Sequence, residues 1–498
     1  MYDILWNLHY FCGLNHTKSI LTDLFPNYTE EKQSIRKFFR SYVYPAMFNM
    51  VVMALYNIVD RIFIGQGAGA LAICGLALTL PCVSLLSTVG TLTGVGAAAR
   101  ISTSISLGNR SLACCILGNA TVLNILLSTI LIVYSLYHLD FILDIFGGSG
   151  QTIPYARKYM SILIPASLLT NLNFTYCHAI RASGFSRKSM TIVFAGVIPN
   201  IILAPIFIFG FAGIPAMGIA GAAWATVLSQ AFAAAVMLLI LHFRYRFLTF
   251  VALQWRFLKN TWLMITRFAI PSMFGMLLMP IGNGVVTWVL SQFGDEAVAA
   301  SAAAGRLEVV AFFFPMALGT ALMPMVGQNY GARLYSRINQ CRRFAMRFAF
   351  CYLLGMAFLF VVSAPWMVKF FSTDPKVIPI MVAYLRIISF GFGMIEIHRY
   401  STFFFTGCGR PGISAWLNAL RIAGLMIPFT LLALWFRSLN GVFAARLAAD
   451  LIAGSIGLYC ARRMTMSLPE DGLPDRALLK SISGTMLEAE AEDKTAEE

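Results

Sequence analysis

The chain has 498 residues, of which 58 % are hydrophobic and 12 % are charged, and its mean hydropathy is +0.74. A soluble globular domain carries about 25 % charged residues, so this composition predicts a polytopic membrane protein. The formal net charge is +15, but the basic residues are scattered among apolar runs and no DNA- or RNA-binding motif occurs. This pattern argues against a nucleic-acid partner and fits Lys- and Arg-rich cytoplasmic loops.

The sequence also lacks the usual signatures of enzymes and metal sites. The ten cysteines form no CxxC pair and lie mostly in apolar segments, which argues against a disulfide framework or a zinc site. No HExxH, Walker A or GxSxG motif occurs. We therefore predict neither an enzyme nor a bound cofactor, and any transport activity would be driven by an ion gradient rather than by a nucleotide.

Apolar segments of membrane-spanning length recur twelve times along the chain. The start has no cleavable signal and reads as a cytoplasmic lead-in. Several spans contain Pro or Gly, which membrane helices tolerate when neighbouring groups satisfy the freed backbone. The expected spans are 41–64, 72–99, 113–137, 155–180, 189–211, 217–242, 262–291, 298–326, 344–370, 379–405, 412–436 and 441–461.

Positive charge alternates between successive connections of these spans. The odd-numbered connections carry little positive charge, whereas the even-numbered connections are basic. This alternation predicts an even number of spans with both termini in the cytoplasm. The basic residues are Arg110; Arg181, Arg187 and Lys188; Arg244, Arg246, Arg256 and Lys259; Arg333, Arg337, Arg342 and Arg343; Arg410; and, after the last span, Arg462 and Arg463.

The two halves of the chain repeat each other at an offset of about 225 residues. An even number of helices per copy makes the repeat parallel, with its pseudo-two-fold axis along the membrane normal. We predict an all-α integral membrane protein with twelve transmembrane helices in two pseudo-symmetric six-helix bundles. The matching pairs are Pro45 with Pro271, 70–75 with 296–301, 106–110 with 329–333, and 181–186 with 406–411. The predicted parts are an N-terminal lead-in (1–37), a first bundle (38–242), a cytoplasmic linker (243–261), a second bundle (262–463) and a disordered acidic cytoplasmic tail (464–498).

One carboxylate, Asp60, lies near the far end of the first expected span, beside Arg61. A charged side chain at the centre of a bilayer costs about 2.5 to 3.5 kcal/mol on insertion scales. Two interpretations stay open at this point. Asp60 is either a helix-end charge that reaches the headgroups or a buried group that faces a cavity and binds a proton or cation.

Several motifs resemble the multidrug and toxic compound extrusion (MATE) family. LYNIVDRIFIG (55–65) with GALAICGL (69–76) is similar to the first span and loop of that family. The resemblance covers about residues 38–463 and extends to a bacterial branch related to DNA-damage-inducible and staphylococcal multidrug pumps. Further matches are RASG (181–184), NIILAPIFIFG (200–210), GIAGAAWAT (218–226), GRLE (305–308) and MPMVGQNYGA (323–332).

The resemblance implies a monomeric antiporter in a bacterial inner membrane, surrounded by lipid. It would export amphipathic, often cationic small molecules in exchange for H⁺ or Na⁺ by alternating access. Asp60 matches the family's first-span carboxylate, joined in a polar cluster by Tyr159, Asn173, Asn200 and Thr226. These four residues also have simpler interpretations: an interfacial aromatic for Tyr159, hydrogen bonds between helices for the two Asn residues, and helix packing for Thr226.

The sequence departs from the family at one important position. The family pattern NxxLDP is here NIILAP (200–205), so Ala204 stands where the second carboxylate is expected. Coupling would then depend on Asp60 alone, with one H⁺ or with one Na⁺ held by neutral oxygen ligands.

The second half has buried charges of its own. Glu308, Glu396 and His398 are secondary candidates for coupling or substrate binding, and Glu396 with His398 suggests a proton relay. Arg446 and Asp450 are spaced to form an ion pair on one helix face.

Two other classes of function remain as alternatives. The first is a flippase for lipid-linked oligosaccharide or polysaccharide, whose pyrophosphate would require cations such as Arg306, Arg399 and Arg421. The second is a channel, but no selectivity filter or ring of like charge is visible.

Overall fold

The computed structural model describes residues 35–106, 110–145, 152–211, 215–244, 255–369 and 374–472. Almost all of the expected lead-in, much of the expected linker and most of the expected acidic tail lie outside these residues. Every described element of regular structure is helical. By contacts, the chain forms two units, one of residues 40–270 and one that contains residues 271–472 together with Ile35–Phe39.

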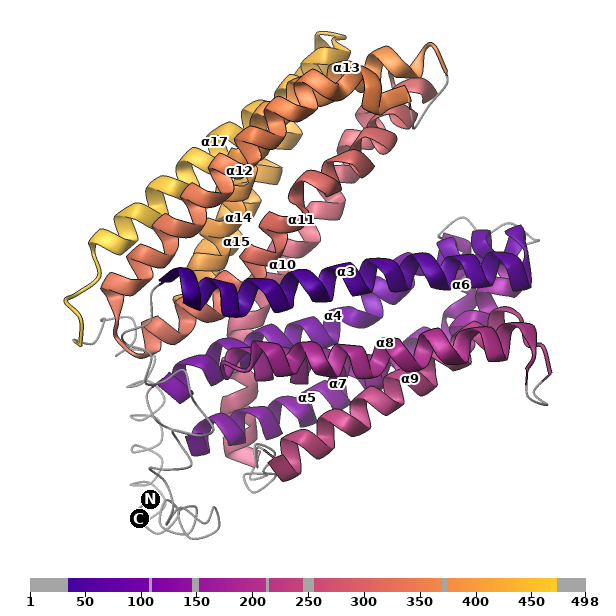
Figure 1. The fold of residues 1–498 in the computed structure, drawn as a ribbon, viewed down its shortest axis with the longest axis vertical. Coiled ribbons are helices and arrows are strands. Elements are labelled where there is room, and N and C mark those ends of the chain that lie inside the picture. The colour runs from indigo at the N-terminus through magenta and orange to yellow at the C-terminus, as the bar shows by residue number, and fades with distance from the viewer. Residues whose placement is uncertain are drawn as a thin grey trace. The chain divides into compact units, whose positions relative to one another are not determined.

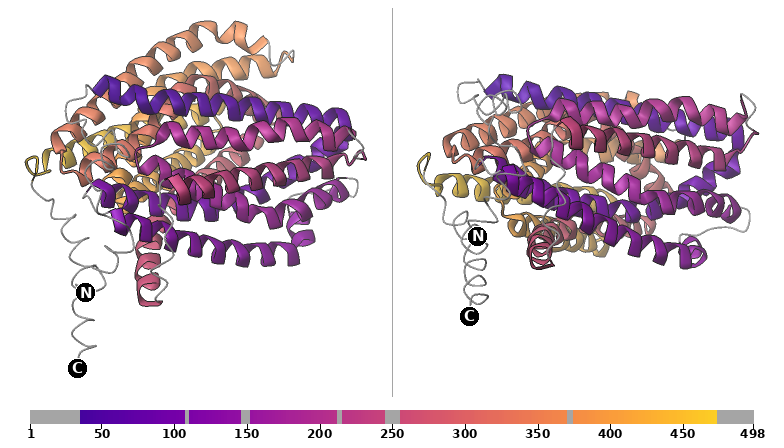
Figure 2. Two further views of the ribbon diagram at one scale, coloured as in Figure 1. Left: turned by 60° about the horizontal axis from the view of Figure 1, so that its bottom comes forward. Right: turned by 90° about the horizontal axis from the view of Figure 1, so that it is seen from below.

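The first unit is a layer-like bundle in which α7 lies at the centre. Helix α7 packs against α4, α5, α8 and α9, and α8 also packs against α9. Figures 1 and 2 show these helices in indigo to magenta, running side by side. Its helices are α3 (Ile35–Ala68), α4 (Ala70–Ser106), α5 (Arg110–Tyr137), α6 (Leu139–Ile145), α7 (Ile153–Ala182), α8 (Ser186–Phe209) and α9 (Ile219–Leu239), which continues as the π-helix η3 (Ile240–Arg244).

Glycines bring α4 and α7 into close contact. A Cβ atom on Gly90 would lie 2.7 Å from the Asn171 Cα atom, and one on Gly94 would lie 3.2 Å from the Thr175 Cα atom. Small residues allow membrane helices to approach closely enough for van der Waals packing and hydrogen bonds.

Helix α3 packs on α8 through its C-terminal half, where Ile64 shares an apolar cluster with Ile208.

The second unit is built around α14. Helix α14 packs against α11, α12 and α17, and α12 also contacts α17 (Figure 1). Its elements are α10 (Trp255–Ser291), α11 (Asp295–Gly331), α12 (Tyr335–Lys369), α13 (Val377–Ile388), the 3₁₀ turn η4 (Ser389–Gly391), α14 (Phe392–Gly407), α15 (Pro411–Ala419), the π-helix η5 (Leu420–Met426), α16 (Ile427–Trp435) and α17 (Leu439–Met466).

Each of the twelve expected spans coincides with one helix or with an unbroken series of helical elements. Among the described residues, nine of these are long and apolar enough to cross a membrane, and Val193–Phe209 in α8 is a shorter apolar helix. Helices α3 and α7 are not among the nine, and both carry polar residues of the candidate site. The prediction of an all-helical membrane protein is confirmed.

Helix α10 is divided between the two units. Its N-terminal part packs on α5, because Asn119 Nδ2 donates to Thr261 Oγ1 (3.1 Å) and Trp262 Nε1 donates to the Asn119 carbonyl (3.0 Å). The contact boundary at Pro271 therefore lies inside the span expected at 262–291 and not in the expected linker.

Candidate functional site

Helices α3 and α7 bring phenol groups to Asp60, and α9 forms a hydrogen bond with one of these phenols. Asp60 is half-buried on α3 and interacts electrostatically with Tyr56, one turn earlier, and with Tyr159 of α7. Tyr159 is only 7 % exposed. The Tyr56 side chain also forms a hydrogen bond with the Thr226 side chain of α9. Sequence reasoning missed Tyr56, although residues four apart on a helix share one face.

Asn200 and Thr226 form the α8–α9 side of this cluster. Asn200 Nδ2 donates to Thr226 Oγ1 at 3.2 Å, and Thr226 Oγ1 donates to the Ala222 carbonyl at 3.0 Å. Asn200 is 3 % exposed, and its Oδ1 atom is buried without a hydrogen-bond partner in the described part of the chain. A buried carbonyl oxygen without a donor is costly and is the kind of ligand that hard cations prefer.

Asn173 connects α7 to α9 at a different level. Its Nδ2 atom donates to Gln230 Oε1 (2.8 Å) and to the Gln230 carbonyl (3.1 Å), one helical turn beyond Thr226. These hydrogen bonds join α7 to α9. Asn173 therefore has the geometry of a helix bridge, and its Oδ1 atom, like that of Asn200, is buried without a hydrogen-bond partner among the described residues.

Ala204 lies in the apolar interior of the first unit. It is 1 % exposed and belongs to one core cluster with Ile64, Tyr159 and Ala223. The position that carries a carboxylate in the family pattern is thus packed with apolar groups here, and α8 contributes the neutral amide of Asn200 to the site.

A buried network between α4, α5 and α7 was not expected from the sequence. Asn124 Nδ2 donates to Thr93 Oγ1 and to Thr175 Oγ1, both at 2.8 Å, and Asn171 Nδ2 donates to Ser128 Oγ at 2.9 Å. All five residues are at most 1 % exposed. The signal was available, because Asn124 and Asn171 are polar residues within apolar spans, and such residues commonly bridge membrane helices.

In the second unit, the expected Arg446–Asp450 pair is wrong, because each residue binds a different helix. Arg446 donates to Glu308 Oε2 of α11 at 2.8 Å and also to the Tyr384 hydroxyl of α13. Asp450 accepts from Arg421 Nε of η5 at 2.8 Å. Four residues advance about 6 Å along a helix, which places each side chain beside another neighbour.

Glu396 and His398, which suggest a proton relay, have different direct partners. Side chains two apart on a helix do not face each other. Glu396 is 0 % exposed, and its Oε2 atom lies 3.2 Å from Arg399 NH1. His398 Nε2 lies 3.2 Å from Asn418 Oδ1 on α15. The two titratable groups therefore belong to different contacts.

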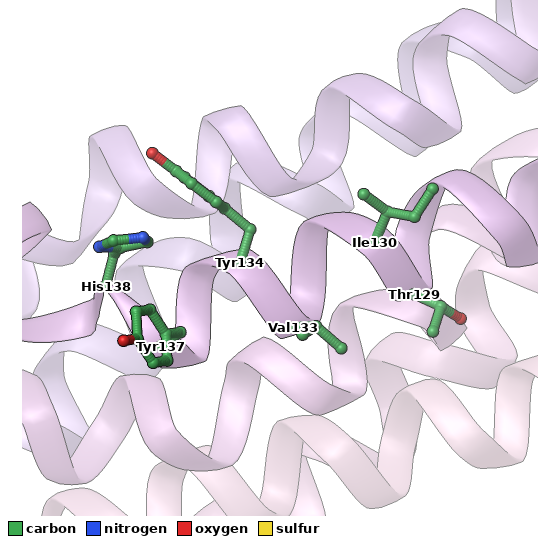
Figure 3. Close-up of a pocket in the computed structure, with 6 residues that line it drawn as sticks. All are labelled: Thr129, Ile130, Val133, Tyr134, Tyr137 and His138. Carbon is green, nitrogen blue, oxygen red and sulfur yellow. The ribbon is translucent and has the colours of Figure 1, made fainter.

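A shallow cavity of about 490 Å³ lies on the surface of α5, apart from the residues around Asp60. Figure 3 shows its lining, in which the rings of Tyr134, Tyr137 and His138 lie at one end and Ile130 and Thr129 at the other. Tyr134 and Tyr137 are 56 % and 84 % exposed. Exposed aromatic rings at the end of a span are typical of the membrane–water interface, so we do not assign this cavity to transport.

A known family model, MatE, matches the chain twice, over residues 45–206 and 271–432. The matches begin at Pro45 and Pro271, the two prolines whose offset predicts the internal repeat. The chain therefore belongs to the MatE family, whose members are membrane transporters and not enzymes. This confirms the family and the class of protein expected from the sequence motifs.

Individual relatives agree with this assignment over nearly their whole length. An FAD transporter of Shewanella oneidensis is 26 % identical, covering 84 % of this chain and 93 % of that protein. The multidrug export protein MepA of Staphylococcus aureus is 25 % identical, covering 89 % of this chain and 98 % of MepA.

Solved structures share the fold. The Vibrio cholerae MATE transporter VcmN in the bent form has a TM-score of 0.80 at 23 % identity, covering 87 % of this chain and 97 % of VcmN. A MOP superfamily transporter from Pyrococcus furiosus has a TM-score of 0.78 at 21 % identity, covering 88 % of this chain and 98 % of that one. The twelve-helix fold is thus that of MATE transporters.

Proposed function

We propose that the protein is a secondary active antiporter that exports amphipathic, often cationic compounds in exchange for H⁺ or Na⁺. It works by alternating access of two six-helix bundles, as a monomer in a bacterial inner membrane with both termini in the cytoplasm. It needs no cofactor besides the coupling ion. The observation that carries this proposal is the arrangement of Asp60 with Tyr56, Tyr159 and the Asn200–Thr226 pair. The relative named MepA, a multidrug export protein, supports the direction of transport and the kind of substrate.

The chemistry of coupling follows from the groups around Asp60. A carboxylate within a membrane-spanning helix needs a counter-charge, so the site suits a bound proton, a bound Na⁺ or a cationic substrate. The Asn200 Oδ1 atom and the Thr226 and tyrosine hydroxyls supply the neutral oxygens that Na⁺ would need. Because Ala204 adds no second carboxylate, the site exchanges one monovalent ion for one positive charge on the substrate.

The test is ethidium efflux from vesicles that contain the purified protein. A proton gradient and a sodium gradient are imposed separately on the wild type, Asp60→Asn and a matched control, Asp140→Asn. Asp140 is 63 % exposed on α6 and pairs with Arg157, so its loss leaves the site intact. We expect one gradient to drive efflux in the wild type and in the control but not in Asp60→Asn. Equal efflux in all three proteins contradicts the proposed role of Asp60.

The FAD transporter relative suggests a second candidate substrate, an amphipathic dinucleotide. Arg399 supports it, because its guanidinium lies 5.4 Å from the centre of the Phe312 ring and its side chain is 28 % exposed. A flat guanidinium beside an aromatic ring suits stacking with the flavin ring, whereas its charge is compensated by Glu396. FAD efflux that falls in Arg399→Gln, with ethidium efflux absent, would favour this substrate.

The flippase alternative is weaker, because two of its three candidate cations lie against carboxylates. Arg421 pairs with Asp450 and Arg399 lies against Glu396, while Arg306 is exposed. A pyrophosphate site needs uncompensated positive charge. Lipid-linked substrates are the next test if neither ethidium nor FAD is transported.

A further inference from the structure

The residues after α17 fold back onto the turn between α11 and α12. Asp471 accepts hydrogen bonds from the Ser336 N–H (2.9 Å), the Ser336 hydroxyl and the Tyr335 N–H. Gly472 N donates to the Arg333 carbonyl at 2.9 Å. The first N–H groups of a helix have no partner within the helix, so Asp471 caps α12 from 135 residues away. We call this contact the Asp471 clasp.

The clasp carries charge that persists at neutral pH. Partial burial opposes ionisation of Asp471, but the hydrogen bonds from Ser336 and Tyr335 outweigh it and lower the pKa of this carboxyl. The carboxylate is therefore the form that binds α12. The Asp471 clasp holds Gly472 beside the first turn of α12. The chain after Gly472 therefore starts from this position.

Four arginines of α12 and α17 gather at the same end of this unit, and we call them the arginine surface: Arg342, Arg343, Arg462 and Arg463. Arg342 interacts electrostatically with both Arg343 and Arg462, so the two helices bring like charges together. Arg342 and Arg343 share the Asn339 Oδ1 atom at 2.9 and 3.2 Å. Arg343, Arg462 and Arg463 are exposed.

The positive charge of this surface is not balanced within the described part of the chain. None of the four arginines forms an ion pair there with a carboxylate. Arg342 is 5 % exposed, and its Nε atom is buried without a hydrogen-bond partner among the described residues. A buried guanidinium among like charges is costly, so the surface favours an anionic partner.

We propose that the arginine surface binds the acidic end of the same chain, Glu488–Glu498. This segment, EAEAEDKTAEE, has six carboxylates and one lysine. About 15 residues separate it from Gly472 and reach at most about 50 Å when extended, whereas Arg343 lies only about 12 Å along α12 from Tyr335. Tethering raises the effective concentration of the segment to the millimolar range. Ion pairs that are individually weak can therefore together hold the acidic segment on the arginine surface.

The test is photo-crosslinking of the full-length protein in nanodiscs of neutral phosphatidylcholine. A benzoylphenylalanine is placed at position 489, within the acidic segment. We expect crosslinks to residues 335–350 and 459–466, reduced about fivefold or more at 0.5 M salt, because high salt screens surface charge. Crosslinks that map elsewhere in the protein overturn the proposal.

Charge variants make the test specific. Arg343→Gln with Arg462→Gln should remove most of the crosslink, whereas the control Lys369→Gln with Lys376→Gln, at the other end of α12, should not. Glu490→Gln, Glu492→Gln and Asp493→Asn together should also remove it without altering the helices. Crosslinks that are unchanged in these acidic-segment variants overturn the proposal. Loss of the crosslink only in anionic phosphatidylglycerol nanodiscs would assign the surface to lipid headgroups and equally overturn it.

Discussion

The carboxylates of the two units differ in the contacts that the fold gives them. In the first unit, the half-buried Asp60 interacts electrostatically with the phenols of Tyr56 and Tyr159. In the second unit, Glu308, Glu396 and Asp450 each lie against an arginine on the same or another helix. A buried carboxylate that is bound to an arginine has a permanent counter-charge within the protein. We therefore assign structural ion pairs to the second unit, and the proposed coupling role stays with Asp60 in the first.

Neutralising Asp60 should have the largest effect on transport. We expect Asp60→Asn to reduce gradient-driven efflux to the leak rate of protein-free vesicles, because the amide binds neither a proton nor Na⁺ in place of a carboxylate. Thermal stability should change by less than about 1 kcal/mol, as for a substitution that strands no buried charge. Efflux and melting are measured on the same preparation. A large loss of stability would show that Asp60 is structural, like its counterparts in the second unit.

The opposite outcome is expected for the Arg421–Asp450 pair. Both side chains are at most 7 % exposed, so Arg421→Met leaves a buried carboxylate and should cost about 3–5 kcal/mol of stability. Arg421→Met with Asp450→Leu should recover most of this loss, because it removes both charges. Melting temperature reports the change in each variant. If the single and double variants melt alike, the pair is not a structural element.

The two asparagines of the first unit should have different roles. Asn200→Ala removes a buried carbonyl oxygen and the hydrogen bond to Thr226, and we expect the half-saturating concentration of the coupling ion to rise about tenfold, or about 1.4 kcal/mol. Asn173→Ala removes the bridge to Gln230 and should instead cost about 1 kcal/mol of stability with unchanged ion dependence. Efflux at graded ion concentrations separates the two effects. The same ion dependence for both variants would remove Asn200 from the proposed site.

The sequence was sufficient where hydropathy and repetition decide the structure. It predicted the helix positions, and the Pro45–Pro271 offset was confirmed by the double match to the family model. The sequence did not predict side-chain partners that depend on how one helix is rotated against another. Arg446 and Asp450 share a face of α17, yet only the positions of α11 and η5 determine that they bind Glu308 and Arg421.

Contacts between distant parts of the chain were also beyond the sequence. Nothing local indicates that Asp471 caps a helix that begins at Tyr335, because the two segments meet only when α12 and α17 have packed. Tyr56 is the opposite case, since its spacing from Asp60 was visible and was overlooked.

The smallest expected effect concerns the clasp, which lies outside the spans and should affect neither class of buried carboxylate. Asp471→Ala removes a helix cap and should cost about 1 kcal/mol of stability, with gradient-driven efflux retained. Because hydrogen bonds lower the pKa of Asp471 in the folded protein, its contribution is present above the ordinary aspartate pKa of about 3.9 and disappears as the pH falls through the lowered value. Melting of the wild type and Asp471→Ala should therefore differ at pH 7 and converge at strongly acidic pH. A difference that grows on acidification contradicts the capping role.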